Sequence, residues 1–332
     1  MKNRLKTAAS AGAASALLLA LLTVGWAASP KREAAHPFSQ ARRDGGAGSR
    51  SSVRAAAVPA AARFRESERL GLLVETWVNG SGPFTFALDT GAGATILSRR
   101  TAAEARVEVE AGARGVELGG LSGRTIGGAA KAFPRSLALG SRENLLPSRG
   151  FVVVAPALPE GLDGVLDPSE SYHPLGFVVD MPRGEIRAFD PRLTPLRAGD
   201  HPPGGATLRW LTDGRTRRPF VALDGGRRAL LDTGSAYGLA VDEHAARSLG
   251  IEVGGGRERG ERRDIAGGSV AARRIRPATV NLGPLALRRV PTDLLLRAEK
   301  GAPVILGRDA LRPFEIIFDP ASRLVMLKPG DE

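Results

Sequence analysis

The sequence contains one pattern twice, and this repeat constrains the fold more than any other feature of the chain. The stretch Phe84-Thr-Phe-Ala-Leu-Asp-Thr-Gly91 returns as Arg228-Ala-Leu-Leu-Asp-Thr-Gly234, which places Asp89 and Asp232 143 residues apart. Each triplet ends an apolar run that follows a favoured two-residue turn, Asn79-Gly80 or Asp224-Gly225. The pattern therefore predicts a β-hairpin ahead of each aspartate.

Further landmarks follow both aspartates in the same order and at nearly the same spacing, as expected for two copies of one structural unit. The matched features are the helix caps Ser98 and Asp242 (helices about 98–105 and 242–249), the strand ends Gly140 and Gly283, the segments 164–167 and 304–307, and the strands 177–180 and 316–319. We therefore predict two mostly β lobes, residues 64–195 and 207–332, joined by a proline-rich stretch.

The N-terminus is typical of an export signal. Lys2, Arg4 and Lys6 precede an uncharged stretch, residues 7–28, that ends near small residues suited to cleavage. We predict that residues 1–29 are a signal peptide and that the protein is exported to the periplasm or the extracellular space. The alternative is an uncleaved signal, in which case residues 7–28 anchor the protein in the membrane. Residues 30–63 are predicted to be a flexible low-complexity linker, and a cleavable pro-segment would have the same composition.

The net charge of +12 on 332 residues suggests a nucleic-acid partner until its distribution is considered. Residues 1–60 carry much of the excess, and the remaining arginines are spread evenly without interleaved aromatic residues that could stack on bases. We therefore predict no nucleic-acid binding. The chain has no cysteine, which excludes disulfides, a lipid anchor and cysteine zinc ligands, and its four histidines are scattered. No metal and no cofactor are expected.

The repeated triplet has a chemical interpretation when both copies meet. Two neighbouring carboxylates, Asp89 and Asp232, cannot both ionise in a partly desolvated cleft, so the pair shares a proton. One carboxylate then acts as a base toward a water molecule while the other acts as an acid. Thr90 and Thr233 could lock the two loops by hydroxyl hydrogen bonds. Gly91 and Gly234 would allow tight turns that direct backbone N–H groups at the carboxylates.

With these paired Asp-Thr-Gly triplets, each followed by a small residue and later by an apolar-apolar-Gly element, the sequence resembles the aspartic proteases of the pepsin and retropepsin group over residues 64–332. The resemblance implies an all-β fold of two β-barrel-like lobes related by a pseudo-twofold axis, with short helices. It also implies a monomer that hydrolyses peptide bonds of a protein or peptide substrate, with Asp89 and Asp232 as the catalytic pair. The glycine-rich loops around Gly127-Gly128 and Gly267-Gly268 would be the flaps that cover the substrate.

Some features depart from the family pattern. Lobe 1 has Asp167 where lobe 2 has Gly307, and neither flap candidate contains the tyrosine typical of pepsin-like flaps. A single Asp-Thr-Gly is commonly no more than a turn at the end of a strand. The sequence therefore leaves an alternative to an endopeptidase: an exported, non-catalytic peptide-binding protein that retains the fold.

Overall fold

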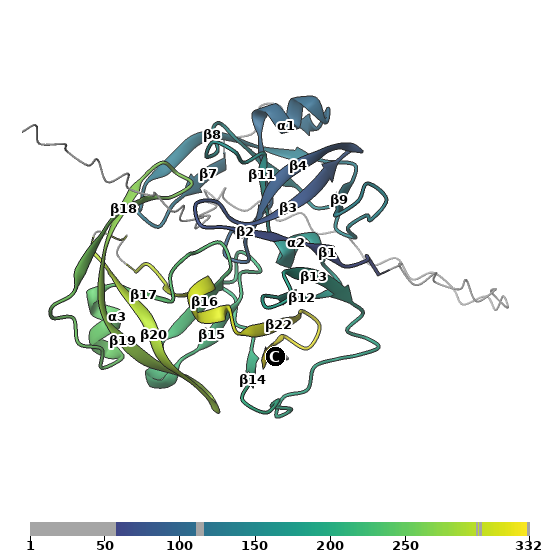
Figure 1. The fold of residues 1–332 in the computed structure, drawn as a ribbon. Coiled ribbons are helices and arrows are strands. Elements are labelled where there is room, and N and C mark those ends of the chain that lie inside the picture. Colours follow the sequence, from purple (N-terminus) through teal and green to yellow (C-terminus); the bar gives the residue numbers. More distant parts are fainter. Residues whose placement is uncertain (1–57, 111–115, 297, 299–300, 331–332) are drawn as a thin grey trace, which may run out of the picture.

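The structure is a computed structural model that describes residues 58–110, 116–296, 298 and 301–330. Strands are the main secondary structure of these residues, and the few helices are short (Figure 1). The predicted signal, residues 1–29, and residues 30–57 of the predicted linker lie outside the described residues. The end of that linker range is ordered into a sheet, because β1 (Ala62–Arg63) pairs with β13 (Glu185–Phe189).

The first of three sheets belongs to the N-terminal half of the chain and is called lobe 1 below. Its strands are β2 (Arg65–Ser67), β3 (Gly71–Val78), β4 (Ser81–Leu88), β5 (Ile96–Ser98), β6 (Glu108–Val109), β7 (Val116–Gly119), β8 (Thr125–Phe133), β9 (Leu137–Leu139), β10 (Val152–Ala155) and β11 (Gly164–Leu166). In the middle of this sheet, β11 pairs in parallel with β4 and antiparallel with β5, and β5 pairs in parallel with β10. This arrangement places the end of β4, and hence Asp89, inside the lobe.

The second sheet, called lobe 2, repeats that connectivity. Its strands are β15 (Phe220–Ala222), β16 (Arg228–Asp232), β17 (Leu239–Val241), β18 (Arg257–Arg263), β19 (Ser269–Leu282), β20 (Leu285–Leu295) and β21 (Val304–Gly307). Here β21 pairs in parallel with β16 and antiparallel with β17, and β17 pairs in parallel with β20. The same order of parallel and antiparallel partners in both lobes agrees with the repeat in the sequence.

A third sheet joins the two halves of the chain. It takes β1, β13 and β12 (Gly176–Asp180) from the first half and β22 (Phe314–Asp319), β23 (Leu324–Pro329) and β14 (Ala206–Arg209) from the second. Its centre is the antiparallel pair β12 and β22, in which Phe177 lies opposite Phe318 and the two rings stack at 4.5 Å. These phenylalanines come from the matched segments of the repeat. The joint sheet therefore lies where the two copies meet, and its side chains belong to the main hydrophobic core.

Short helices occur at matched places in each lobe. Helix α1 (Arg99–Glu104) is capped by the side chain of Ser98, and α3 (Glu243–Ser248) by that of Asp242, as the sequence predicts. Helix α2 (Pro168–Ser171) follows β11, and α4 (Arg308–Leu311) follows β21. Each of these last two helices begins directly after the strand that pairs with the aspartate-bearing strand. This position brings them beside the site described below.

The two predicted hairpin turns differ in the structure. Asn79 and Gly80 both have positive φ values, 51° and 79°, and connect β3 to β4 in two residues as predicted. The connection between β15 and β16 is longer, with a short 3-10 turn, Asp224–Gly226, in place of a two-residue turn. The prediction of a two-residue turn at Asp224-Gly225 was therefore wrong. The reason is a second glycine, Gly226, which also takes a positive φ and lengthens the loop.

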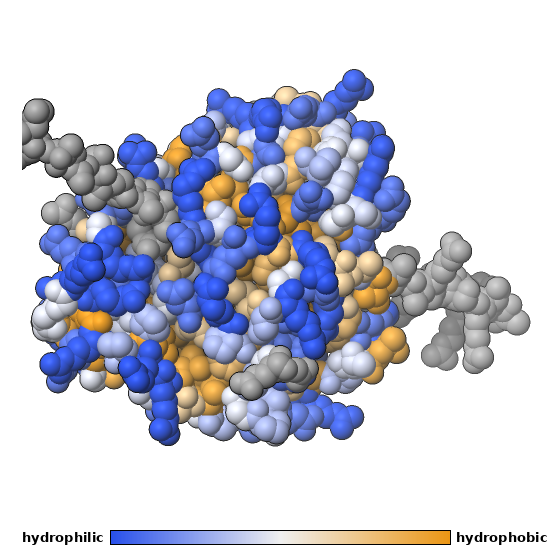
Figure 2. All heavy atoms as spheres, viewed as in Figure 1, coloured by the Kyte–Doolittle hydropathy of each residue, from blue (hydrophilic) through white to orange (hydrophobic). Residues whose placement is uncertain are grey.

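The molecular surface is rich in charged side chains. Hydrophilic residues are spread over both lobes on the face that Figure 2 shows. Within the ranges that the structure describes, no helix is long and apolar enough to cross a membrane.

Candidate functional site

The two repeated aspartates are buried at the ends of corresponding strands. Asp89 follows β4 and donates its backbone N–H to the carbonyl oxygen of Leu166 at 2.9 Å. Asp232 is the last residue of β16, where it lies opposite Gly307 of β21. The side chains are almost completely inaccessible to solvent, with residue exposures of 0% and 2%. A carboxyl group this deeply buried needs strong local interactions, because burial strongly disfavours its charge.

A reciprocal hydrogen-bond network between Thr90 and Thr233 joins the two aspartate loops. The hydroxyl of Thr90 donates to the carbonyl oxygen of Leu231 at 2.6 Å, and the hydroxyl of Thr233 donates to that of Leu88 at 3.2 Å. Each hydroxyl also accepts the backbone N–H of the opposite threonine at 3.1 Å. Both threonines are fully buried, so the four bonds are shielded from water. The network therefore fixes the position of one loop relative to the other.

The glycine of each triplet lies against the aspartate of the opposite lobe. A Cβ atom on Gly91 would lie 2.7 Å from Cγ of Asp232, and one on Gly234 would lie 2.4 Å from Cγ of Asp89. Both distances are shorter than non-bonded carbon atoms tolerate. Each carboxyl group therefore occupies the space that a side chain would need if the glycine of the opposite triplet were replaced by any other residue. The structure brings all six residues of the two triplets together, as the sequence analysis predicts.

The local environment gives the two carboxyl groups different pKa values. Burial raises the pKa of Asp89 well above its usual range, and the neighbouring Asp232 raises it further by charge repulsion. Burial also raises the pKa of Asp232, but hydrogen bonds from Asp89 and from the backbone N–H of Ser235, at 3.0 Å, oppose this effect. The charge of Arg308 lowers the pKa of Asp232 as well. Asp232 is therefore the more acidic member of the pair and Asp89 the member that retains a proton.

Asp167 adds a third buried acid close to the pair. It follows β11, caps α2 by accepting the backbone N–H of Ser169 at 2.8 Å, and is fully buried. Burial, followed by the charge of Glu170, raises the pKa of Asp167 to about 8. Asp167 is therefore neutral at neutral pH. In lobe 2 the same position requires glycine, because a Cβ on Gly307 would lie 2.4 Å from the carbonyl oxygen of Tyr237.

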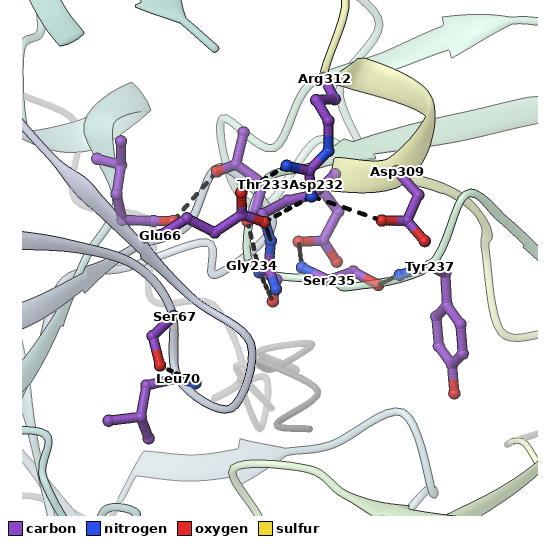
Figure 3. A network of polar contacts seen from close by, with 12 residues as sticks. Glu66, Ser67, Leu70, Asp232, Thr233, Gly234, Ser235, Tyr237, Asp309 and Arg312 are labelled. Atoms are coloured by element: carbon purple, nitrogen blue, oxygen red, sulfur yellow. Dashed lines mark hydrogen bonds and ion pairs between the residues drawn. The ribbon is translucent and has the colours of Figure 1, made fainter. Parts of the chain in front are cut away.

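Lobe 2 has a buried cation, Arg308, in the position after Gly307. One guanidinium nitrogen of Arg308 donates to the carbonyl oxygens of Thr233 and Gly234, at 3.2 Å and 3.0 Å. The guanidinium also lies 3.6 Å from a carboxylate oxygen of Glu66 in β2. Arg312 binds the same carboxylate through two hydrogen bonds of 2.7 Å and 2.8 Å (Figure 3). Glu66 of lobe 1 is thus tied to the loop that carries Asp232. No pattern in the sequence singles out Glu66, Arg308 or Arg312, since an ion pair between distant segments leaves no local pattern.

Two hairpin turns, one from each lobe, meet and interlock. Tip 1, residues 120–124, connects β7 to β8, and tip 2, residues 264–268, connects β18 to β19. Asp264 of tip 2 accepts the backbone N–H of Ser122 at 2.9 Å and its hydroxyl at 2.6 Å. The apolar residues are exchanged, because Leu121 packs in the cluster of lobe 2 and Ile265 packs in that of lobe 1. The cluster around Ile265 includes Ala92, the residue after the first triplet. Tip 2 is therefore packed into the same apolar cluster as the first aspartate loop.

The glycines predicted as flaps occupy different places in the two hairpins. Gly267 and Gly268 belong to tip 2, and a Cβ on Gly268 would collide with the Ser122 hydroxyl. Gly127 and Gly128 lie within β8 instead, three residues and more beyond the turn, where the pairing with β7 shifts register. The interacting residues Ser122 and Asp264 were not singled out from the sequence. Ser122 follows Asp89 by 33 residues and Asp264 follows Asp232 by 32. This nearly equal spacing within the repeat is the sequence feature that could have identified the two residues as a pair.

Comparisons with known proteins agree with this architecture. Residues 74–166 match the family model described as "Aspartyl protease", and residues 225–313 match the model described as "gag-polyprotein putative aspartyl protease". Each lobe is thus an aspartyl protease domain of the pepsin and retropepsin type. No curated protein matches the chain. The two matched segments contain Asp89 and Asp232 respectively.

The aspartyl protease lobes have the groups for acid–base chemistry and offer no metal cluster in the described part of the chain. Nowhere in those residues do three or more His, Asp or Glu side chains lie close enough together to hold an ion. The described site consists of two carboxyl groups with different protonation behaviour, fixed by backbone hydrogen bonds. Such a pair can take one proton from a water molecule and give another to a substrate oxygen.

The threonine network gives a prediction on stability. Thr90→Val keeps the shape of the side chain but removes two buried hydrogen bonds and leaves the N–H of Thr233 unpaired. We expect the free energy of unfolding to fall by about 2 kcal/mol for Thr90→Val and by a similar amount for Thr233→Val. Thr125→Val, on an exposed position of β8, is the control and should change it by less than about 0.5 kcal/mol. Denaturant unfolding measures all three, and a stable Thr90→Val variant would contradict the structural role of the network.

The interlocked tips give a prediction on dynamics. Asp264→Ala removes the acceptor of three hydrogen bonds, two from Ser122 and one from the N–H of Gly268. The loss of these hydrogen bonds should lower the free energy needed to open the tips by more than about 1 kcal/mol, roughly the contribution of one hydrogen bond. Amide hydrogen exchange should therefore become faster by about tenfold or more in both tips. The control is Asp224→Ala, at an exposed aspartate whose side chain forms no hydrogen bond with the residues that the structure describes. Exchange that stays unchanged in tip 1 would show that Asp264 does not hold the two tips together.

Proposed function

We propose that this protein is an aspartic endopeptidase, in which Asp89 and Asp232 activate a water molecule for the hydrolysis of peptide bonds. The observation that carries the proposal is the buried carboxyl pair, one member from each aspartyl protease lobe, with pKa values that differ. A peptide-binding protein without turnover would have no need to bury two acids against each other, since this costs free energy. The match of both lobes to aspartyl protease families supports the same chemistry.

The electrostatics assign a role to each aspartate. Asp232, the more acidic, would be ionised and would accept a proton from the attacking water. Asp89, which retains its proton, would donate it to the carbonyl oxygen of the scissile bond, so that a neutral tetrahedral intermediate forms. Transfer of the proton from Asp232 to the amide nitrogen then allows the C–N bond to break, while Asp89 recovers a proton from the intermediate. The protons balance over the cycle, and no covalent bond to the enzyme forms.

The interlocked tips fit a substrate cover in this proposal. The aspartates are inaccessible to solvent in the structure, in which the tips are joined, and we propose that a polypeptide enters after the contact between Ser122 and Asp264 opens. Renewed closure would exclude bulk water and strengthen the interactions within the site. We further propose that the enzyme acts as a monomer on proteins or peptides outside the cytoplasm. Residues 1–29 would direct its export or hold it at the membrane.

The first test replaces each acid by its uncharged isostere. Asp89→Asn and Asp232→Asn should each lower the cleavage rate of an unfolded protein by about 10²- to 10⁴-fold, because the pair loses its base or its acid. Digestion followed by mass spectrometry measures the rate, and thermal unfolding should show that both variants remain folded. Asp224→Asn, on an exposed loop, is the matched control and should retain full activity. Wild-type protein that binds the substrate but never cleaves it would instead support the peptide-binding alternative.

The second test is the pH dependence of cleavage. The reactive form has Asp232 ionised and Asp89 protonated, so it exists above the pKa of Asp232, about 6, and below that of Asp89. Activity should therefore rise as the pH increases through about 6 and should fall again at higher pH as Asp89 loses its proton. Initial rates across the pH range, with stability checked at each value, give the profile. A rate that continues to rise far into alkaline conditions is incompatible with this mechanism.

A further inference from the structure

A cavity of about 620 Å³ at the junction of the two lobes is lined by positive charge. Its walls include the side chains of Arg215, Arg217, Arg228 and Arg323, and the buried Trp210 and the neighbouring Leu211 supply apolar surface. The volume falls within the range of pockets that bind drug-sized ligands, and is larger than a single inorganic ion needs. The cavity is separate from the aspartate pair, and none of its residues has a role in the proposed hydrolysis.

The positive charge of this cavity is largely uncompensated. Glu170, in α2, is the one carboxylate among the residues that line the described cavity, and it is already paired with Arg217 at 3.3 Å. Arg228 donates to a backbone carbonyl at 3.4 Å and lies over the ring of Phe220, and it has no ion pair with any acid in the described part of the chain. Arg215 and Arg323 are exposed, and neither has an ion pair with a described residue. Several guanidinium groups around one concave surface attract an anion and can bind a carboxylate through two hydrogen bonds.

The cavity is physically connected to the loop that carries Asp89. Its wall includes Thr216, in the segment 213–218 that precedes β15. On its other side this segment packs against the loop that carries Asp89. A Cβ on Gly93 of that loop would lie 3.2 Å from the methyl carbon of Thr216 and 3.4 Å from Cδ of Arg218. The buried Arg218 and the partly buried Asp213 form an ion pair that holds the segment in place. The cavity and the first aspartate loop thus share one wall.

We propose that this cavity, lined by Arg215, Arg217, Arg228 and Arg323, binds acidic residues of the polypeptide substrate outside the cleavage site. The proposal rests on the proposed function and adds a substrate class to it: chains with glutamate or aspartate near the scissile bond. A polypeptide fits better than a small anion for two reasons. The apolar surface of Trp210 and Leu211 lies beside the guanidinium groups, which suits an extended chain with both apolar and acidic side chains. The shared wall also places such a chain next to the active-site loop.

The direct test measures binding without any need for cleavage. The probe is a fluorescein-labelled hexaglutamate peptide, titrated with the wild-type protein at low salt and followed by fluorescence anisotropy. Mass spectrometry verifies that the probe stays intact. In the double variant Arg215→Gln/Arg323→Gln the affinity should fall by about tenfold or more, because two charge-assisted contacts are lost. These side chains are exposed and have no ion-pair partner within the described ranges, so the variant should remain folded.

The matched control is Arg99→Gln/Arg288→Gln, which removes the same charge from exposed positions elsewhere and should change the affinity by less than about twofold. Labelled hexaglutamine should not bind. Equal loss of affinity in both double variants would overturn the proposal, since the binding would then follow net charge alone. Binding of inorganic phosphate to the cavity without any binding of hexaglutamate would also overturn it, in favour of a small-anion site.

A second measurement connects the cavity to specificity. When the wild type digests a peptide library, acidic residues should be enriched at a fixed distance from the cleaved bonds, and the Arg215→Gln/Arg323→Gln variant should lose this enrichment while still cleaving. Cleavage without acidic enrichment in the wild type would contradict the role of the cavity in substrate choice. If the wild type binds hexaglutamate through the arginines but cleaves no peptide, the proposed function fails and the anionic site stands.

Discussion

Two buried carboxyl groups can lie against each other only if they do not both carry charge, and this constraint governs the centre of the molecule. Asp89 and Asp232 come from different lobes, and each occupies the space left by a glycine of the other lobe. The reciprocal bonds between Thr90 and Thr233 hold the loops at this separation against the repulsion of the acids. The joint sheet below, with Phe177 stacked on Phe318, ties the two copies together over a wider area. Shared protonation is thus a consequence of how the lobes are joined.

The two halves of the chain have the same strand topology, but the charged side chains near their aspartate loops differ. Glu66 of lobe 1 forms ion pairs with Arg308, the first residue of α4, and with Arg312, the residue directly after that helix. On the other side, the helix of lobe 1 supplies the acid, Glu170, and lobe 2 supplies Arg217. A cation therefore lies next to the loop of Asp232, and a third acid, Asp167, lies near Asp89. This asymmetry, which a strict twofold dimer could not have, favours the ionised form of Asp232 and the protonated form of Asp89.

Much of this arrangement could be predicted from the sequence because a repeat carries long-range information. The equal spacing of the Asp-Thr-Gly triplets, the caps Ser98 and Asp242, and the strand ends predicted two similar β lobes with the aspartates together. The loop at Asp224-Gly225 was less predictable, because a two-residue turn and a longer glycine-rich loop begin with the same dipeptide. Contacts between lobes, such as those of Asp264 with Ser122, depend on packing that no local pattern records. The lining of the cationic cavity is likewise assembled from segments far apart in the sequence.

The protonation state of the pair can be measured directly by ¹³C NMR of protein labelled at the aspartate carboxyl carbons. Signals of the pair are assigned by their loss in Asp89→Asn and Asp232→Asn. We expect that one carboxyl group of the pair, that of Asp89, is still protonated at neutral pH while that of Asp232 is ionised. We also expect that removing either acid changes the titration of the other. Independent titration of both groups near the ordinary aspartate pKa of about 4 would contradict the account, because the two acids would then not share a proton.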